Sequence, residues 1–510
     1  MSIALRNMVW RGAAFAVLAT CAAPLYAETT LIWPTNEEYR DWDPAATYST
    51  ETYVLGNVYE TLTFFENGEI RPRLAVSWEK SDGGKTWTMQ LRQGVKFHDG
   101  SEFNAEAVKK SVLYTKEEGR GAGFLYAPLD SIETPGSHEI VFHFSRPIAF
   151  DLIASGQYGS YIIAPAAIDK GHDWMQEGNA IGTGPYVLSK VESGKLTILD
   201  RFDDYWGGWE DGQIDRVIQQ TVYEPSTRIQ MLVSGEADVI VPPFSQLKRL
   251  EENEKVDVSA ATSWRNTQFL INVGKYPTDN AKFREALSYL WDYESVVNNI
   301  YHGYADIPSG PLPANMWGHG TYEMPTFDPA KAAALLAESG VPQKDWKVSV
   351  SFKNSDMQFR DAAEFFQATA GTAGVQVELF PAEWSVLAEK ARNEETASNI
   401  TSMTWWPAYA TPSDWLYSQY RSEDKALFNL SYYKNPALDA AVDAAAEAEG
   451  ISRELATEKY VAAQDILMQD PPAIFIADIY RAYAHSSDIK GMESNLNPAY
   501  ETLFVYNLKK

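Results

Sequence analysis

The chain has 510 residues, more than one hydrophobic core usually supports, so we expect at least two lobes. Hydrophobic residues make up 45% of the chain and charged residues 22%, which is ordinary for a globular protein and excludes a largely disordered one. The formal net charge of −26 repels phosphate backbones and anionic membrane surfaces, so binding to nucleic acid is not expected.

Residues 1–27 have the pattern of a secretory signal peptide. Arg6 and Arg11 precede an apolar run over 12–21, and Leu25-Tyr26-Ala27 offers a cleavage end with a small residue. The apolar run is shorter than the roughly 20 residues that span a bilayer, which disfavours a membrane helix. We therefore expect an exported, soluble product that begins near Glu28.

Cys21, the only cysteine, lies inside this segment. A lipid anchor on Cys21 is disfavoured because Thr20 precedes it in place of the usual small residue. The mature product would then have no disulfide and no cysteine metal site. Loss of the two arginines leaves 41 basic residues against 69 acidic ones, a net charge of −28.

The first half of the chain alternates between strand and helix patterns. We expect an early strand from 31, a helix over 47–62, a β-hairpin over 74–99 with its turn at 81–84, a helix over 104–114, a strand at 140–144, a hairpin over 187–201, a strand at 217–223, a helix over 226–234 and a strand at 238–241. The strand–helix–strand order at 217–241 predicts that its two strands pair in parallel.

The same mixture of elements restarts after Trp264, which predicts a second α/β lobe. Its expected strands are 268–273, 347–352, 375–379 and 474–479, and its expected helices are 281–300, 329–338, 360–373, 386–393, 437–449 and 453–468. No short-period repeat or low-complexity segment interrupts the chain.

The sequence offers little for catalysis. His138 and His143 are five residues apart, whereas a zinc-peptidase helix needs a spacing of four, and the residues between them favour a strand. His98 is explained as a hydrogen-bonded turn residue, and Gly182-Thr183-Gly184 lacks the third glycine of a dinucleotide site. We therefore expect that the chain is not an enzyme and that it binds no metal or cofactor of its own. A secreted hydrolase stays open only because carboxylates distant in sequence can meet in space.

Residues 401–415, Thr-Ser-Met-Thr-Trp-Trp-Pro-Ala-Tyr-Ala-Thr-Pro-Ser-Asp-Trp, concentrate large aromatic side chains. Pro407 and Pro412 forbid a continuous helix, so the rings must be presented from irregular backbone. Such a loop is either a binding wall or a plug over a core, and the residues alone leave both interpretations open.

Several motifs together resemble the family 5 extracellular solute-binding proteins, the oligopeptide, dipeptide and nickel receptors of ABC importers. They are Ala75-Val76-Ser77-Trp78, Ser81 to Trp87, Leu91 to Gly100, Asn104 to Val108, Gly182 to Tyr186, Tyr205-Trp206, Gly235 to Asp238, Phe283 to Leu287, Phe327 to Ala332 and Pro471-Pro472. One departure is Trp291 before Asp292, where the family usually has a small residue.

The resemblance implies an α/β, two-lobed clamp of the periplasmic-binding-protein type (type II, in the cluster with an extra subdomain in lobe I), with ligand enclosed between the lobes. By analogy, lobe I takes 28–263 plus 482–510, with an inserted subdomain at about 58–180, and lobe II takes 264–481.

The function implied is that of a periplasmic receptor, a monomer, which delivers its ligand to the permease subunits of an ABC importer in the inner membrane. A peptide or peptide-like molecule is the first expected ligand. An oligosaccharide or an opine is the alternative, and a nickel chelate comes third because the aromatic loop contains no histidine.

The resemblance also implies site residues. The loop that aligns with Trp405 to Pro412 lines the cleft in this family, and peptide receptors place there an aspartate that pairs with the ligand amino group. Ala408 stands at that position, so only Asp414 could substitute, if the loop bends. The expected ligand-binding residues are Tyr48, Trp264, Asn266, Lys353, Trp384, Trp405, Trp406, Tyr409 and Asp414, with Lys353 placed to hold an anionic group. A place in the core is an equal alternative for Tyr48, Trp264, Asn266 and Trp384, and a place on the solvated surface is an equal alternative for Lys353.

Overall fold

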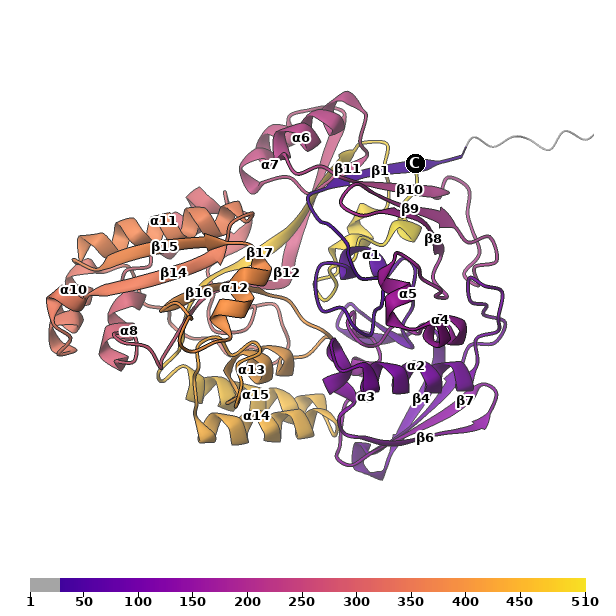
Figure 1. Cartoon of the computed structure of the whole chain (residues 1–510), viewed down its shortest axis with the longest axis horizontal. Coiled ribbons are helices and arrows are strands. Elements are labelled where there is room, and N and C mark those ends of the chain that lie inside the picture. Colours follow the sequence, from indigo (N-terminus) through magenta and orange to yellow (C-terminus); the bar gives the residue numbers. More distant parts are fainter. Residues whose placement is uncertain (1–27) are drawn as a thin grey trace, which may run out of the picture.

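The structure, a computed structural model, describes residues 28–510, so the predicted signal peptide and Cys21 lie outside the described residues. Figure 1 shows two lobes of mixed α/β structure, joined by the long strands β12 (Val256–Ile271) and β17 (Ala473–Ser486). The predicted fold class is confirmed. Within the described residues, the chain contains no helix with the length and apolar character needed to cross a membrane.

The N-terminal lobe is built on a four-stranded sheet in the order β1-β10-β9-β8. These strands are β1 (Thr30–Thr35), β10 (Arg216–Thr221), β9 (Leu196–Arg201) and β8 (Tyr186–Glu192). Strand β1 runs parallel to β10, and the other pairs are antiparallel. Alternate residues Leu31, Trp33 and Val217 are almost fully buried, as expected for a sheet with one face on a core.

A second four-stranded sheet, fully antiparallel, is inserted in this lobe in the order β4-β5-β7-β6. Its strands are β4 (Ala75–Ser81), β5 (Thr86–Leu91), β7 (Glu139–Phe144) and β6 (Leu129–Gly136), and the short pair β2 (Thr63–Glu66) and β3 (Glu69–Pro72) precedes it. The hairpin and the strand that contains His143 are confirmed. Helix α2 (Ala105–Glu118) begins where the Asn104 side chain accepts the Ala107 N–H.

The largest sheet has seven strands in the order β11-β17-β12-β16-β14-β15, with β13 (Ala305–Asp306) paired to β17. Its remaining strands are β11 (Val239–Ile240), β14 (Lys347–Lys353), β15 (Gln376–Ala382) and β16 (Ile400–Trp405). Strands β12 and β17 pair along almost their full lengths, from Val256 opposite Ser486 to Leu270 opposite Ala473. This antiparallel pair is the main covalent and hydrogen-bonded link between the lobes.

Helices cover both faces of this sheet in the C-terminal lobe, and α2 lies along one side of the inserted sheet of the other lobe (Figure 1). In the C-terminal lobe they are α8 (Ala281–Ser288), α9 (Tyr293–Ser295), α10 (Pro329–Glu338), α11 (Met357–Thr372), α12 (Trp384–Ala391), α13 (Ser413–Tyr420), α14 (Pro436–Glu449) and α15 (Arg453–Leu467). The earlier helices are α1 (Thr52–Leu55), α3 (Phe150–Ile153), α4 (Pro165–Lys170), α5 (His172–Gln176), α6 (Pro225–Ser234) and α7 (Phe244–Glu251). One buried cluster contains α8 and α11, and a second contains α13, α14 and α15.

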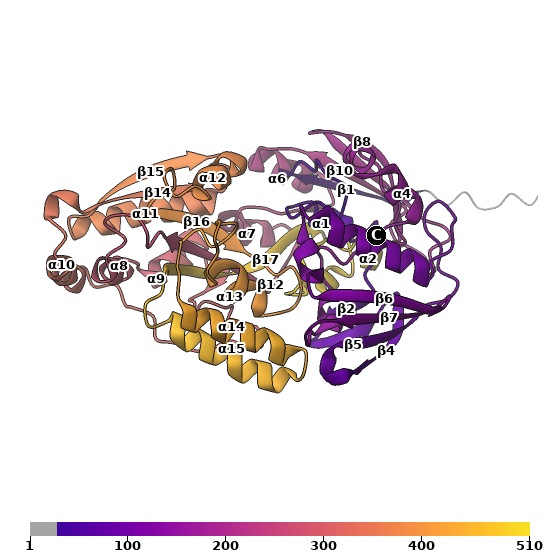
Figure 2. The same ribbon diagram turned by 60° about the horizontal axis from the view of Figure 1, so that its bottom comes forward.

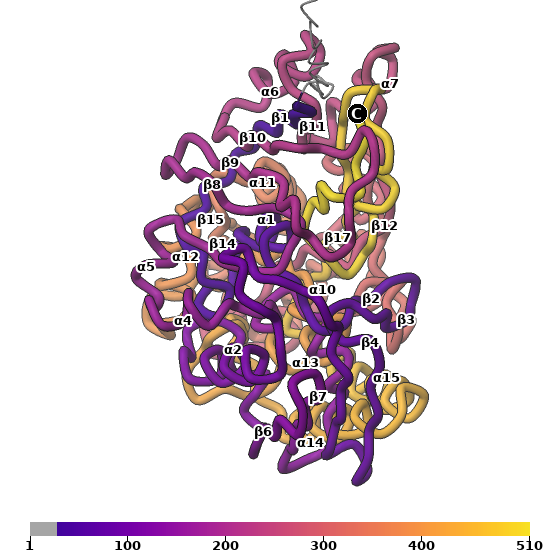
Figure 3. Tube along the Cα trace, turned by 90° about the vertical axis from the view of Figure 1, so that its right-hand side faces the viewer, coloured from indigo at the N-terminus to yellow at the C-terminus, as the bar shows by residue number. Residues whose placement is uncertain are grey.

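The two lobes also meet away from the crossing strands. Figure 2 shows the inserted sheet beside α14 and α15, and there the Lys80 ammonium donates to the carbonyl of Ile451 at 2.7 Å. The C-terminal tail returns to the N-terminal lobe (Figure 3), where the Lys510 ammonium donates to the Thr30 carbonyl at 3.2 Å. The lobe limits expected from the sequence stay a prediction.

Two predicted helices are too long. The helix expected over 47–62 is only α1, because Asn57 leaves the helical pattern to bond the C-terminal tail: its amide donates to Leu503 and accepts from the N–H of Val505. The helix expected over 281–300 breaks after α8, where Leu290 and Trp291 turn into the core, and the Asp292 side chain then caps α9.

The predicted parallel pairing within 217–241 is wrong. Strand β10 pairs with β1 and β9, whereas β11 pairs antiparallel with β17 in the largest sheet. Helix α6 therefore carries the chain from one sheet to another. The sequence pattern describes only the elements and their order, so it could not distinguish a shared sheet from two neighbouring ones.

We expect Trp291→Ala to lower the free energy of unfolding by about 3–5 kcal/mol, because the side chain is fully buried against Phe269, Phe365 and Phe366. Trp291→Phe should cost much less, because it keeps an aromatic ring and the indole N–H has no partner to lose. Chemical denaturation of both variants measures the difference. An alanine variant no less stable than the phenylalanine variant would contradict this packing.

Candidate functional site

The aromatic loop predicted from the sequence continues directly from a central strand. Strand β16 pairs with β12, with Trp405 opposite Asn266, and α13 begins again at Ser413. The carboxylate of Asp414, in the first turn of α13, accepts the backbone N–H of the loop residue Ala408 at 2.7 Å and the Ser418 hydroxyl at 3.3 Å. The loop therefore bends so that the Asp414 carboxylate lies beside Ala408. This is the bend that Asp414 needs if it is to take the place of the aspartate expected at position 408.

Burial governs the ionisation of the acids under this loop. It raises the pKa of Asp414 to about 7 and that of Glu449 to about 7, against hydrogen bonds that favour their charged forms. Glu449 accepts from the Thr411 hydroxyl at 2.9 Å and from the Tyr460 hydroxyl at 2.6 Å. Both carboxyl groups therefore hold the loop from the protein interior.

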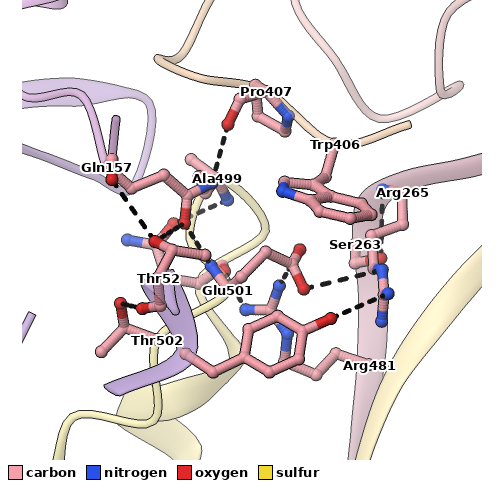
Figure 4. A network of polar contacts seen from close by, with 12 residues as sticks. Thr52, Gln157, Ser263, Arg265, Trp406, Pro407, Arg481, Ala499, Glu501 and Thr502 are labelled. Carbon is pink, nitrogen blue, oxygen red and sulfur yellow. Dashed lines mark hydrogen bonds and ion pairs between the residues drawn. The ribbon is translucent and has the colours of Figure 1, made fainter. Parts of the chain in front are cut away.

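The other side of this loop contacts the N-terminal lobe. The Gln157 backbone N–H donates to the Ala408 carbonyl at 2.9 Å, and its side-chain amide donates to the Pro407 carbonyl at 2.7 Å (Figure 4). The Trp406 indole N–H donates to the Tyr158 hydroxyl at 3.0 Å. Three direct hydrogen bonds thus join the loop to 157–158 of the opposite lobe.

A buried ion cluster lies next to Trp406 (Figure 4). The carboxylate of Glu501, in the C-terminal tail, accepts from Arg481 of β17 at 2.6 Å and lies 3.6 Å from the Nε of Arg265 of β12. The Arg265 guanidinium also lies 3.4 Å from the Tyr53 hydroxyl and packs over the Trp406 ring, 5.4 Å from its centroid. Two guanidinium groups share the one carboxylate that ion-pairs with them, so the paired groups carry an excess positive charge. The charge of Asp356 also acts on Arg265, and burial raises the pKa of that acid.

Arg265 differs from Arg481 in exposure and in bonding. The Arg265 side chain is 25% exposed and that of Arg481 is 6% exposed. Arg481 also donates to the Asn497 carbonyl at 3.0 Å. The Nε of Arg265 is buried 3.6 Å from Glu501 and its Nη2 donates to Tyr53, which leaves Nη1 as the nitrogen without a partner among the described residues. Burial acts to lower the pKa of Arg265, but Glu501 and Tyr53 outweigh it, so the group is cationic. Arg265 is the member of the cluster with donors left to offer.

Aromatic rings continue the boundary beyond Trp406. Tyr48 lies 4.5 Å from Tyr158 and 5.6 Å from Phe428 of the opposite lobe, measured between ring centroids. Phe428 also packs against Trp405 at 5.0 Å. Rings of both lobes therefore pack against one another at tilted and edge-on angles across the boundary, and they are planar apolar groups of the kind that line ligand sites.

The nine expected site residues lie in four different surroundings. Tyr48, Trp406 and Tyr409 lie at the boundary between the lobes, and Asp414 lies beneath the loop. Trp264, Asn266 and Trp405 are buried: Trp264 packs on Phe65, and the Asn266 amide donates to Pro311 and accepts from Trp415. Lys353 and Trp384 are partly exposed, at the end of β14 and the start of α12. Ligand-binding roles for all nine stay predictions.

Sequence reasoning missed the charged members of the boundary. Arg265 lies between Trp264 and Asn266, both of which were singled out, and strand alternation turns it to the opposite face of the sheet. Glu501 and Gln157 lie in segments without any motif. The pattern of β12 did not distinguish Arg265, because its neighbours Ser263, Asn266 and Thr267 are polar too. The described residues contain no cluster of three or more His, Cys, Asp or Glu side chains that could hold a metal ion.

Two lobes joined by a pair of crossing strands, with rings and charges where they meet, define the architecture of a clamp-type solute-binding protein. Residues 69–426, well over half of the chain, match the family described as "Bacterial extracellular solute-binding proteins, family 5 Middle". The chain belongs to this family of solute-binding proteins.

Known proteins resemble the chain from end to end. It is 28% identical over 501 residues to a glutathione-binding protein, GsiB, of Pectobacterium atrosepticum, and the match covers 96% of each chain. Among solved structures, the periplasmic binding protein DppA of Helicobacter pylori in complex with the peptide STSA has a TM-score of 0.83 at 24% identity, covering 94% of this chain and 98% of that one. NikZ of Campylobacter jejuni in complex with Ni(L-His) has a TM-score of 0.83 at 22% identity, covering 95% and 100%.

We expect Glu501→Gln to lower the free energy of unfolding by about 3–5 kcal/mol, because it leaves two buried guanidinium groups without their counter-charge. Glu338→Gln, which removes an acid from the exposed pair with Lys282, is the matched control and should leave stability nearly unchanged. Urea denaturation of both variants decides. Equal effects would show that the Glu501 cluster does not support the fold.

A second expectation concerns pH. The folded protein keeps the Glu449 proton up to about pH 7, whereas the unfolded chain loses it near pH 4.5, so this group makes the free energy of unfolding fall as pH rises through that window and level off above it. Glu449→Gln should flatten part of the fall. Glu447→Gln, at an exposed acid of the same helix, should not. Denaturation curves at several pH values test this, and an unchanged slope in the Glu449 variant would refute the assignment.

Proposed function

We propose that this chain is the periplasmic receptor of an ABC importer, which captures a peptide or a peptide-like molecule between its two lobes and delivers it to a membrane permease. Family membership and the end-to-end similarity to glutathione-binding proteins support this proposal. The division into lobe I (28–263 and 482–510, with the insertion at about 58–180) and lobe II (264–481) belongs to the same proposal, because both lobe limits fall on the crossing strands β12 and β17.

The observation that carries the proposal is the excess positive charge at the boundary between the lobes. A peptide or glutathione presents carboxylate groups, and the partly exposed Arg265 guanidinium beside Trp406 can donate to one through Nη1, which has no partner in the described part of the protein. A neutral oligosaccharide offers nothing to this charge, although its flat faces suit the rings. An opine, which combines carboxylates with an amine, uses the same features and is the second candidate.

Asp414 supplies the opposite charge. Its carboxylate lies beside Ala408, the position at which an acid was expected, and its charge acts on the Tyr48 and Tyr409 hydroxyls at the boundary. A ligand ammonium near it would favour its ionised form. The wall thus combines an anion anchor at Arg265 with a carboxylate at Asp414, which suits a zwitterionic ligand.

Tryptophan fluorescence of the purified mature chain tests the ligand class, because Trp406 lies at the boundary and the buried Trp405 packs on Phe428 beside it. We expect saturable changes with glutathione or with peptides of two to five residues. A response to an oligosaccharide alone would overturn the peptide proposal, and a response to an opine alone would replace it by the second candidate. Mass spectrometry should recover the ligand unchanged, since turnover would indicate a hydrolase.

Arg265→Gln should weaken the binding of a responding peptide by about tenfold or more, since hydrogen bonds to a charged group contribute about 1.5–3 kcal/mol. Amidation of the peptide carboxyl group should weaken binding to the wild type similarly and have no further effect on the variant. Arg249→Gln, on the exposed surface of α7, is the matched control. Full affinity in the Arg265 variant would remove this residue from the site.

A further inference from the structure

A cavity of about 220 Å³ lies beside the crossing strands, outside the ion cluster described above. It is lined by Thr262 and Ser263 of β12, Asp306 of β13, Ala314 and Asn315 of the loop that follows β13, and Asp478 of β17. Asp478 is the register partner of Asn266, whose side chain points to Pro311, and both therefore occupy the sheet face opposite to Arg265. The cavity and the proposed ligand site thus lie on opposite faces of the same two strands.

Asp478 is the unusual residue of this cavity. It is only 5% exposed, and one carboxylate oxygen accepts the Ala314 N–H at 3.0 Å. The other oxygen, Oδ1, is buried without any hydrogen-bond partner in the structure. A buried carboxylate without a counter-charge is costly, and burial accordingly raises the pKa of Asp478 to about 8, so the carboxyl group keeps its proton at neutral pH while the cavity holds no cation. A cation bound at the unpartnered oxygen would take the place of this proton.

The remaining groups that line the cavity are oxygen donors or neutral. Asp306 accepts one hydrogen bond, from the Tyr480 hydroxyl at 3.1 Å, and keeps further acceptor capacity. Thr262 accepts from the Asn315 amide N–H at 3.0 Å, which leaves the Asn315 amide oxygen available. No Lys, Arg or His side chain lines the cavity. Two carboxylates, a hydroxyl and an amide oxygen form a donor set of hard oxygen ligands.

This donor set matches calcium. Ca²⁺ takes six to eight oxygen ligands in flexible geometry, and its charge balances the two carboxylates. The cavity has room for several water molecules, at roughly 30 Å³ each, to complete the coordination. With only two carboxylates, binding belongs to the weak range of extracellular calcium modules, with a dissociation constant of about 10⁻⁴ to 10⁻³ M.

We propose that this cavity binds a hydrated Ca²⁺ ion through Asp478 and Asp306, and that the ion ties β12, β13 and β17 together at the hinge between the lobes. The site involves none of the groups offered to the transported ligand, so the proposal stands independently of that ligand's identity. A cation held here stabilises the folded state by mass action, because the unfolded chain cannot assemble the site.

The test uses the mature chain, freed of metal with a chelator and titrated with CaCl2 at constant ionic strength while thermal unfolding is followed. We expect a saturable rise in Tm and a calorimetric dissociation constant in the millimolar range or below, with a smaller response to MgCl2. Methylammonium chloride tests whether an organic ammonium group, and not a metal ion, occupies the acidic cavity. No saturable response to Ca²⁺, or a saturable response to methylammonium alone, would overturn the calcium proposal.

Variants locate the effect. Asp478→Asn keeps an oxygen to accept the Ala314 N–H, and we expect it to weaken Ca²⁺ binding at least tenfold; Asp306→Asn should weaken it too. Asp257→Asn, at an exposed acid of the same strand β12, should bind as the wild type does. If Asp478→Asn proves unstable, the Asp306 variant decides alone. Unchanged Ca²⁺ binding in both variants would show that any ion binds elsewhere.

Discussion

The pairing of β12 with β17 is the constraint on which the rest of the molecule depends. It holds thirteen register pairs over two strands that begin in one lobe and end in the other. Because the strands are antiparallel and run side by side, they place Arg265 and Arg481 close enough to share the carboxylate of Glu501. The charge cluster at the boundary therefore follows directly from strand register.

The boundary combines two kinds of interaction with different consequences. Rings of Tyr48, Tyr158 and Phe428 supply apolar contact that any planar ligand can replace. The hydrogen bonds of Gln157 to the aromatic loop are instead fixed in direction and join the lobes directly. A ligand that favours the closed arrangement must make contacts that differ between the open and closed states, and Arg265 is the group best placed to make such a contact.

Much of the fold was predictable from the sequence. Apolar alternation located the inserted hairpin, and a helical spacing of apolar residues located α2, because these signals are local. Interactions distant in sequence explain the predictions that failed. The helix expected over 47–62 is short because Asn57 bonds residues more than 440 positions away. The parallel pairing expected within 217–241 does not form because β11 pairs with β17, which lies far along the chain. For the site, the aromatic loop was recognisable by composition, whereas Glu501 and Gln157 matter only through three-dimensional contacts that no motif records.

A crystal structure of the mature chain with a bound peptide tests the central claim most directly, namely that Arg265 and the aromatic loop enclose the ligand between the lobes. The account predicts a ligand carboxylate within hydrogen-bond distance of the Arg265 guanidinium, with Trp406 against the ligand. A peptide bound elsewhere on the protein, with Arg265 still covered by Trp406 and Tyr53 alone, would contradict it.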